Sequence, residues 1–439
     1  MPIGYAVPLM DTPVSLDSPQ RTGQCDVLVI GGGPAGSTIA ALLARRGRDV
    51  VLLEKARHPR FHIGESLLPL NLPLFDRLGV SQEIARIAMP KYGAEFVSPW
   101  HPAPVKYEFR DAWDKAFPLS YQVRRSEFDE ILFRNAARCG ARCFEGWRAC
   151  DVAFDGEGAS VTASGTEGRQ QWRARFVVDA SGRDTFMTDR LGSKRKNLKH
   201  ASAALFGHFS GVARGAGRSA GDIGIFWFDH GWFWLIPLSD GTTSVGAVCK
   251  PAYLKTRRGS PEDFLMETIA LCPALAQRLA EASLASPVTA TGNYSYEAHR
   301  NHGKRYLMLG DAFAFVDPVF SSGVHLAMSS AFYGADAVEI CLDRPRASRR
   351  ALRSHETRMR RALQVFSWFI YRVTTPTMRD LFMNPTNRFR MREALLSVLA
   401  GDVFRRTPFG PSLLVFRASY YLCTAMHHGG RLRSAWQAR

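Results

Sequence analysis

Three glycines near the start of the chain have the spacing of a phosphate-binding turn. Gly31, Gly33 and Gly36 form the pattern GxGxxG directly after the apolar run at residues 27–30. In such a turn the first glycine permits the tight bend, the second lets the backbone approach a pyrophosphate, and the third lets a helix pack closely on the strand. Free N–H groups at that helix N-terminus favour the anion. The spacing therefore predicts a site for nucleotide phosphates.

An acidic residue stands where such a site needs a partner for ribose. Glu54 closes the next apolar segment about 20 residues after the turn, the distance at which a carboxylate hydrogen-bonds ribose hydroxyls. Strand, glycine turn, helix and acidic strand end together predict a dinucleotide site, and these residues alone leave NAD and FAD open. Further candidate cofactor contacts in the same segments are Pro34, Ala35 and Lys55.

A second pattern, GWFWLIPLSDG at residues 231–241, places two tryptophans two positions apart. Residues i, i+2 and i+4 of a β-strand share a face, so we expect Trp232, Trp234 and Ile236 to form one wall. That wall could belong to a packed core strand or could line a reaction chamber. The strand pattern alone does not decide between the two.

Three later segments resemble the flavin monooxygenases. QVRRSEFDEILFRNAAR is similar to the VxRxxFDxxL helix start of those enzymes, which puts Arg125 at the position that contacts the flavin. RARFVVDASGRDT resembles their second glycine turn. RYLMLGDAFAFVDPV ends a strand at Gly310, and the following Asp311 is at the position of the usual acceptor for a ribitol hydroxyl of FAD. This resemblance favours FAD over NAD.

Four segments resemble the flavin-dependent halogenases in particular, over roughly residues 24–420. WFWLIP is similar to their WxWxIP motif, and FHIGESLLP to the strap between the flavin and halide sites. MPKYGAEF is similar to the segment with the catalytic lysine in the phenol and pyrrole branch, and DPVFSSGVHLA to the chloride-binding loop. The resemblance implies that FADH2 and O2 convert chloride or bromide into hypohalous acid, which halogenates an electron-rich aromatic or heteroaromatic ring.

The same resemblance implies roles for individual residues. Lys91 would direct the halogen onto the substrate, the tryptophans would separate the chamber from the substrate, and the turn before the helix at residues 321–338 would hold the halide on backbone N–H groups. The implied residues are Lys91, Glu65, Trp232 and Trp234 for catalysis, Ser66 for the cofactor, Ser322 and Gly323 for the halide, and Phe320 and Pro318 for the substrate pocket.

Simpler interpretations of these residues remain open. Lys91 follows a proline and could be a solvated surface lysine, with Lys106 and Lys115 as nearby competitors for its role. Glu65 could merely satisfy loop backbone, and residues 321–323 could be an ordinary helix cap. Tryptophan halogenases carry a glutamate where this chain has Phe320. Its absence argues against free tryptophan as the substrate and requires another group to manage the ring proton.

The elements that position these residues predict an α/β fold. A chain of 439 residues is too long for one compact core, so we expect two or three sub-domains. We predict a discontinuous Rossmann-like FAD-binding domain interleaved with a mixed-sheet substrate domain, followed by an Arg-rich helical C-terminal region. The FAD-binding domain takes residues 24–85, 122–198 and 290–345, the substrate domain takes 86–121 and 199–289, and the helical region takes 346–439.

Positive charge is concentrated at the C-terminal end of the chain. The formal net charge is +17, and residues 344–439 contain 19 Arg, no Lys and four acids, so that 19 − 4 = +15. Such a block indicates an acidic partner, namely nucleic acid, anionic lipid or an acidic acyl or peptidyl carrier protein, or else a basic face that binds nothing. No nucleic-acid motif accompanies the charge, so we expect no nucleic acid.

Compartment and redox partner follow from what the sequence lacks. Eight cysteines without a CxxC pair predict no metal site. No signal peptide and no apolar run of about 18 residues are evident, so we expect a cytoplasmic protein without a transmembrane segment. No second GxGxxG follows a strand, which implies a separate flavin reductase. The alternatives are a single-component flavin hydroxylase or geranylgeranyl-reductase-like enzyme using NAD(P)H, and a catalytically inactive flavoprotein scaffold.

Overall fold

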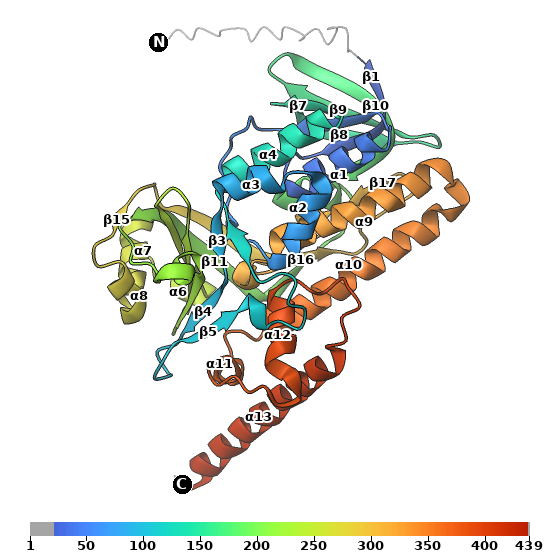
Figure 1. Cartoon of the computed structure of the whole chain (residues 1–439). Helices are drawn as coiled ribbons and strands as arrows, with labels where there is room; N and C mark the ends of the chain where they lie inside the picture. The colour runs from blue at the N-terminus through green and yellow to red at the C-terminus, as the bar shows by residue number, and fades with distance from the viewer. Residues whose placement is uncertain (1–21, 438–439) are drawn as a thin grey trace, which may run out of the picture.

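Two sheets and a set of C-terminal helices make up the molecule (Figure 1). The computed structural model describes residues 22–437, and it describes the side chains of residues 23–195, 197, 202–292 and 295–427. One part is a sheet of parallel strands that is extended by two antiparallel strands and covered by helices, and a larger mixed sheet forms the other. The predicted α/β architecture with a helical C-terminal region is therefore confirmed.

The first sheet carries the predicted glycine turn. Its strands are β1 (Thr22–Ile30), β2 (Val50–Glu54), β7 (Arg142–Glu145), β8 (Arg148–Phe154), β9 (Ala159–Gly165), β10 (Gly168–Asp179) and β17 (Tyr306–Met308), in the order β7-β2-β1-β10-β9-β8 with β17 beside β10. β1 pairs in parallel with β2 and β10. Val27 and Val29 of β1 pack into one hydrophobic cluster and Leu28 and Ile30 into another, as expected for a strand buried on both faces.

Three helices cover the first sheet. Helix α1 (Pro34–Arg45) starts directly at the glycine turn and contacts α4 (Arg125–Arg138) and α9 (Gly323–Asp343). Segments far apart in the sequence therefore meet at the carboxyl ends of the parallel strands, where ligands bind in open α/β sheets. The shorter helices are α2 (Leu72–Leu78), α3 (Ser81–Ile87), α5 (Phe186–Arg190), α6 (Pro251–Leu254), α7 (Pro261–Ala270) and α8 (Pro273–Arg278).

The second sheet contains the tryptophan strand. It runs in the order β18-β16-β11-β14-β13-β12-β4-β5, with β15 beside β11. Its strands are β4 (Gly93–Val97), β5 (Val105–Glu108), β11 (Lys194–Ser210), β12 (Ile223–Phe228), β13 (Gly231–Pro237), β14 (Thr243–Cys249), β15 (Ser283–Leu284), β16 (Thr289–Ala298) and β18 (Ala314–Phe315). A separate two-stranded ribbon pairs β3 (Met89–Lys91) with β6 (Ser120–Gln122).

Side chains of β13 alternate between two hydrophobic clusters. Trp232, Trp234 and Ile236 join the large cluster that reaches the first sheet, whereas Phe233 and Leu235 pack on the opposite face with residues of α7 and α8. The expectation that the two tryptophans and Ile236 share one face is confirmed. That face is the one turned toward the first sheet.

The third segment predicted for the FAD-binding domain contributes to both sheets. Within residues 290–345, β17 joins the first sheet, but β16 and β18 join the second. The first residues of β11 also pair with β16, although they lie before the predicted boundary at 199. A strand's partner depends on contacts with distant strands, so its own sequence pattern could not supply this information. The division into domains itself remains a prediction.

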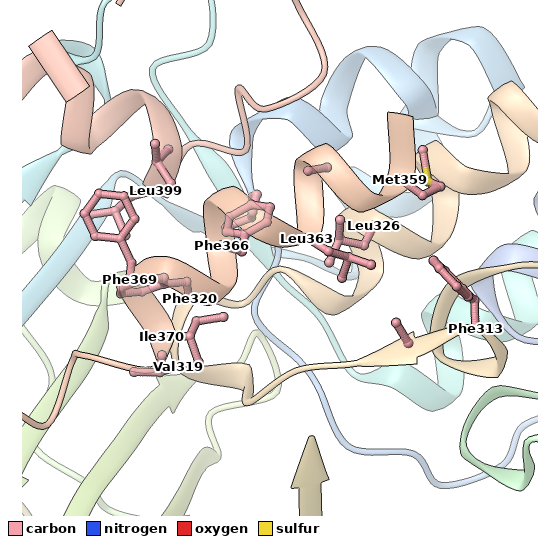
Figure 2. Packing of buried hydrophobic residues seen from close by; sticks show 14 of the residues in the cluster. Phe313, Val319, Phe320, Leu326, Met359, Leu363, Phe366, Phe369, Ile370 and Leu399 are labelled. Atoms are coloured by element: carbon pink, nitrogen blue, oxygen red, sulfur yellow. The ribbon is translucent and has the colours of Figure 1, made fainter. Parts of the chain in front are cut away.

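Four α-helices follow α9 in the described part of the chain. They are α10 (Ser348–Ile370), α11 (Pro376–Met383), α12 (Met391–Leu399) and α13 (Gly410–Gln437). The last of them, α13, packs on α11 and α12. Figure 2 shows Phe369 and Ile370 of α10 beside Phe320 and Val319 of the loop between β18 and α9. This packing fixes the loop from outside. Across residues 22–437, none of the helices combines the length and the hydrophobicity needed to cross a bilayer.

Candidate functional site

A cavity of about 1220 Å³ lies between the glycine turn and the tryptophan strand. It brings together fourteen of the residues predicted from the sequence: Gly31, Gly33, Pro34, Ala35, Glu54, Lys55, Glu65, Ser66, Arg125, Trp232, Trp234, Asp311, Pro318 and Gly323. Gly36, Lys91, Phe320 and Ser322 are not among its lining residues. Both sheets therefore contribute to one site.

The glycine turn is shaped by close backbone contacts. Gly31 has φ +101°, and a Cβ atom there would lie 2.4 Å from the carbonyl oxygen of Ala180. A Cβ on Gly36 would lie 1.8 Å from the carbonyl oxygen of Gly31, so this residue lets α1 approach β1. At Gly33, in contrast, a Cβ would meet only Arg60, at 3.6 Å, and would extend into the open cavity. The turn thus keeps one face free for a closely approaching ligand, which fits a pyrophosphate.

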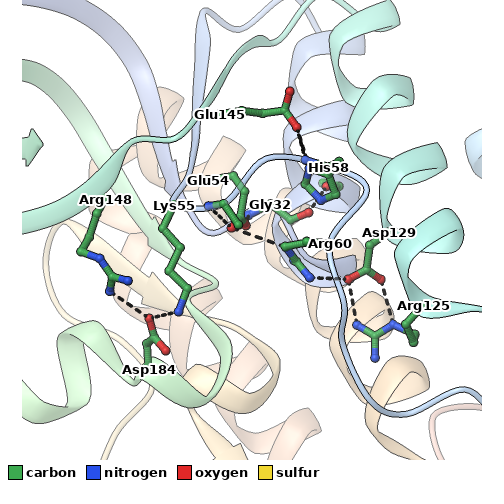
Figure 3. A network of polar contacts seen from close by, with 12 residues as sticks. Gly32, Glu54, Lys55, His58, Arg60, Arg125, Asp129, Glu145, Arg148 and Asp184 are labelled. Atoms are coloured by element: carbon green, nitrogen blue, oxygen red, sulfur yellow. Dashed lines mark hydrogen bonds and ion pairs between the residues drawn. The ribbon is translucent and has the colours of Figure 1, made fainter. Parts of the chain in front are cut away.

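The carboxylate of Glu54 is held in a polar network at the cavity wall (Figure 3). Its two oxygens accept hydrogen bonds from the backbone N–H groups of Gly32, at 2.7 Å, and Ala56, at 2.9 Å. Arg60 lies 3.5 Å from the same carboxylate. These contacts fix the orientation of Glu54 while its position on the cavity wall leaves it accessible to ribose hydroxyls.

Arg125 joins α4 to the strap, which we define as residues 61–69, while a bidentate ion pair within α4 holds its guanidinium in place. Arg125 donates from Nε and Nη2 to the two oxygens of Asp129 at 2.8 and 3.0 Å, and from Nη1 to the carbonyl oxygen of Ile63 at 3.1 Å. Arg60 adds a contact to Asp129 at 3.1 Å. Burial acts to raise the pKa of Asp129, but the neighbouring arginines outweigh it and the pKa is lowered. Arg125 therefore positions the strap at the cavity.

Asp311 presents a carboxylate to the cavity without a protein partner for its side chain in the described part of the chain. Burial raises its pKa to about 6, with Arg183 and Arg125 opposing this change. A buried carboxylate of this kind is stabilised when a ligand hydroxyl donates a hydrogen bond to it. The glycine turn, the Glu54 carboxylate and the Asp311 carboxylate therefore fit FAD. They would bind its pyrophosphate, its ribose and its ribitol, respectively.

Lys91 is buried directly behind the strap. Its Nζ donates hydrogen bonds to Ser66 Oγ and to the carbonyl oxygen of Leu67, both at 2.9 Å, and only 2% of the residue is exposed. Burial lowers its pKa to about 7, although Asp222 acts in the opposite direction. Because Ser66 lines the cavity, one side chain separates the Lys91 ammonium from it.

The competing lysines have different surroundings. Lys106 forms an ion pair with Asp222 at 2.8 Å and is partly exposed. Lys115 is exposed. Of the three lysines considered, only Lys91 is buried at the strap, which disfavours the interpretation of it as a solvated surface group.

The predicted halide turn lies at the start of α9. Ser321 has φ +55°, and both Ser321 and Gly323 line the cavity. Ser322 is the N-cap of α9 and makes no side-chain capping bond. The first N–H groups of a helix have no partner within it, so this end can receive an anion. The start of α9 therefore coincides with the turn that was predicted to hold the halide.

Phe320 lies outside the cavity that it was predicted to line. Its ring stacks on Phe382, with centroids 6.1 Å apart and an interplanar angle of 8°, and contacts Phe369 edge-on at 6.2 Å. Figure 2 shows it pointing toward α10. The apolar side chains of α10 and α11 draw this ring into the core, which leaves Pro318 and Val319 of the same turn on the cavity wall.

The tryptophan wall is accommodated by its neighbouring strand. Trp232 and Trp234 have ring centroids 6.1 Å apart, and Trp234 Nε1 donates to Ser244 Oγ at 3.1 Å. A Cβ on Gly246 of β14 would lie 2.2 Å from the Trp234 ring. The absence of a side chain at Gly246 therefore makes room for Trp234. The face that could have been plain core proves to be both core and cavity wall.

One contact at the site was missed by sequence reasoning. His208 of β11 lies with Nε2 2.8 Å from Oε1 of Glu65, and both side chains are buried. The second oxygen of Glu65, Oε2, has no hydrogen-bond partner among the described residues. An isolated histidine within a strand pattern gives no signal that it pairs with a strap residue more than a hundred positions away.

Comparison with known proteins identifies the family to which the chain is related. Residues 24–368 match the family described as FAD binding domain. Tryptophan 2-halogenase of Chondromyces crocatus is 37% identical over 73% of this chain and 62% of that protein. The 1H-pyrrole-2-carbonyl-(peptidyl-carrier protein) chlorinase of Pseudomonas fluorescens is 30% identical over 86% of this chain and 89% of that protein.

A solved structure extends the likeness to three dimensions. The myxobacterial chondrochloren halogenase, an FAD-dependent halogenase, superposes with a TM-score of 0.77 at 35% identity, covering 88% of this chain and 92% of that one. The chain spans less than two thirds of the length of the tryptophan 2-halogenase, 62%. The glycine turn, the strap, the tryptophan wall and these similarities lead to one conclusion: the chain belongs to the FAD-dependent halogenases.

Proposed function

We propose that this protein is a halogenase that uses FADH2, O2 and chloride or bromide to halogenate an electron-rich aromatic or heteroaromatic substrate. The observation that carries the proposal is the placement of Lys91. This lysine is buried behind the strap, bonded to Ser66, next to a cavity that combines the nucleotide turn with the tryptophan wall. Bound FADH2 and O2 supply the oxidising equivalent that converts halide into hypohalous acid.

The residues of this chain would bind the halide, separate the substrate from the cofactor, and direct the halogen onto the substrate. The start of α9 would hold the halide on backbone N–H groups near Gly323, where the helix dipole favours an anion. Trp232 and Trp234 would keep the substrate away from the cofactor while a small oxidant passes. Lys91 would receive that oxidant beyond the wall.

The buried environment of Lys91 suits this role. A pKa of about 7 makes both the ammonium and the free amine available near neutral pH. The ammonium can donate a hydrogen bond to hypohalous acid, and the free amine can react with it to form a chloramine and water. Either form would present an electrophilic halogen to the ring, and the absence of a carboxylate at Phe320 makes the phenol or pyrrole class the favoured substrate.

The proposal extends to the partners of the reaction. A separate flavin reductase would deliver FADH2, since the sequence shows no second nucleotide turn of the same kind. The substrate is either free or attached to an acyl or peptidyl carrier protein. A carrier-bound substrate is supported by the similarity to the pyrrole chlorinase, because the name of that relative includes a peptidyl carrier protein. A cytoplasmic location would give the enzyme both partners.

A single-turnover experiment tests the proposal. Bound FAD is photoreduced without O2, and O2 is then added with and without bromide in the presence of a panel of phenols and carrier-bound pyrroles. We expect a brominated product only with bromide. Lys91→Met should lower its formation about 100-fold or more, the range for removing a directing acid–base group, while flavin oxidation and trapping of hypohalous acid by monochlorodimedone persist.

Two controls separate the alternatives. Lys115→Met removes an exposed lysine and should leave product formation unchanged. Rapid reduction of the flavin by NADPH alone, with a hydroxylated or hydrogenated product and no need for halide, would establish the hydroxylase or reductase alternative. FAD binding without any turnover would instead establish the scaffold alternative.

A further inference from the structure

Helix α13 has an apolar face that nothing in the described part of the chain covers. Leu414, Tyr421, Leu422 and Met426 are 65%, 53%, 63% and 58% exposed. Together with the exposed Ala418 and Ala425 they occupy positions 414, 418, 421–422 and 425–426, in steps of three to four residues, so they form one stripe along the helix, about 18 Å long at 1.5 Å per residue. Figure 1 shows α13 extending away from the two sheets toward the C-terminus.

The opposite face of the same helix is already occupied. Leu413, Phe416 and Tyr420 are buried in the main hydrophobic cluster, with Phe416 and Phe369 of α10 at a centroid distance of 5.5 Å. The outward stripe therefore does not result from a poorly packed helix. α13 has two apolar faces, and four large side chains in solvent on one of them constitute a patch of the kind that marks an interaction site.

Arginines without acidic partners flank the stripe. The whole of α13 contains no Asp or Glu. Arg372 and Arg417 stack over the Trp368 ring at 4.8 and 5.0 Å, and neither forms an ion pair with a carboxylate among the described residues. The exposed Arg406, just before the helix, also has no ion pair there. The surroundings of the stripe are thus cationic.

Tyr421 links the apolar stripe to this cationic border. Its hydroxyl oxygen accepts hydrogen bonds from Trp368 Nε1 at 3.3 Å and from Arg372 Nη2 at 3.2 Å, while half of the residue remains exposed. An aromatic side chain with a polar end anchored beside arginine and an apolar body facing outward suits the boundary between lipid headgroups and acyl chains.

We propose that the outward face of α13 docks on the surface of an anionic lipid bilayer. Asp380 of α11, which lies 3.6 Å from His427, is the one carboxylate paired with α13 among the described residues. An amphipathic helix with large apolar residues on one side and arginines beside them binds such an interface by burying its apolar face and attracting anionic headgroups. A second copy of this chain fits less well, because pairing two helices that carry arginines and no acids would bring like charges together. The inference does not depend on the proposed reaction.

Vesicle flotation tests the proposal on the full chain with FAD bound. Vesicles of phosphatidylcholine alone and of phosphatidylcholine with phosphatidylglycerol are compared. We expect the protein to float with the anionic vesicles, and the triple variant Leu414→Ser, Leu422→Ser, Met426→Ser to lower its partition coefficient by about tenfold or more, since three large apolar side chains would no longer be buried.

Matched variants define the outcome. Met266→Ser with Leu271→Ser removes exposed apolar side chains at α7 instead and should float like the wild type. Arg406→Gln with Arg417→Gln should also weaken flotation, while Arg257→Gln with Arg258→Gln, exposed arginines near α6, should not. Circular dichroism and retained FAD absorbance establish that each variant is folded.

Three results would overturn the proposal. The first is no flotation of the wild type with anionic vesicles. The second is equal flotation of the wild type and the triple variant, which would reduce the effect to charge alone. The third is a wild-type dimer that becomes a monomer in the triple variant, measured by light scattering, without vesicle binding, which would assign the stripe to a second copy of the chain.

Discussion

The burial of Lys91 lowers the free energy of unfolding by an amount that depends on pH. Its pKa is lowered from the ordinary lysine value of 10.5 to about 7 because burial disfavours the ammonium. Between these two values the unfolded chain binds a proton that the folded protein does not. The unfolded state is therefore favoured progressively as pH falls from about 10 to 7, and the cost is constant below 7.

A substitution makes this cost measurable. Relative to Lys91→Met, the wild type should gain free energy of unfolding as pH rises from 7 to 10, by on the order of 3 kcal/mol, since each pKa unit corresponds to about 1.4 kcal/mol. Urea denaturation of both proteins at several pH values measures the difference. Lys115→Met provides the comparison at an exposed site, and a flat difference for Lys91→Met across this range would show that the lysine is not held neutral by burial.

Single residues differ in how far the sequence could predict them. The three glycines were predictable because only glycine satisfies the close contacts found at Gly31 and Gly36. The pair formed by His208 and Glu65 was not, since neither residue type nor local spacing reports which strand will lie beside the strap. Phe320 was assigned by likeness to the pocket, but helices from the far end of the chain bury it.

At the scale of the element, two glycines of the turn between β1 and α1 have different tasks: Gly36 allows the helix to pack on the strand, and Gly33 leaves room for the ligand. Gly36→Ala would place a methyl group 1.8 Å from the carbonyl oxygen of Gly31 and should destabilise the fold by about 2 kcal/mol or more. Gly33→Ala has φ −77° and open space around its new methyl group, so stability should change by less than about 0.5 kcal/mol.

The two variants should therefore lose FAD for different reasons. Gly33→Ala should weaken FAD binding about tenfold or more because its methyl group occupies the approach of the pyrophosphate. Denaturation of the apoprotein and titration with FAD measure the two effects. If Gly33→Ala bound FAD like the wild type while remaining folded, the pyrophosphate would not lie on this turn.

Strand patterns were predictable from sequence but strand partners were not. The alternation in β13 reports its two faces because the side-chain period of a strand is two. β16 shows an ordinary strand sequence, yet it pairs with β11 of the second sheet although the neighbouring β17 joins the first. Pairing is decided by tertiary contacts over long separations, which no local window contains.

At the scale of the whole molecule, one hydrophobic cluster joins parts that the sequence suggested were separate. It contains Leu28 of the first sheet, Trp232 of the second, and Phe369 and Phe416 of the C-terminal helices. Residues that share one continuous core lose their packing together, so we expect unfolding to be a single transition rather than a sequence of domain steps.

Removal of α13 tests this coupling. A chain that ends at Phe409 lacks three buried hydrophobic side chains of the described residues, Leu413, Phe416 and Tyr420, and uncovers Phe369. At about 1.5–3 kcal/mol for each buried large side chain, the loss should be on the order of 5 kcal/mol. Because Phe369 contacts Phe320 in the turn beside the cavity, the transition followed by flavin fluorescence should shift to lower urea together with the transition followed by far-ultraviolet circular dichroism.

The triple serine variant of the outward stripe should leave both midpoints almost unchanged, since its side chains are exposed. A flavin transition that stays in place while only helical signal is lost would show that α13 is an independent appendage and that the shared core ends before it.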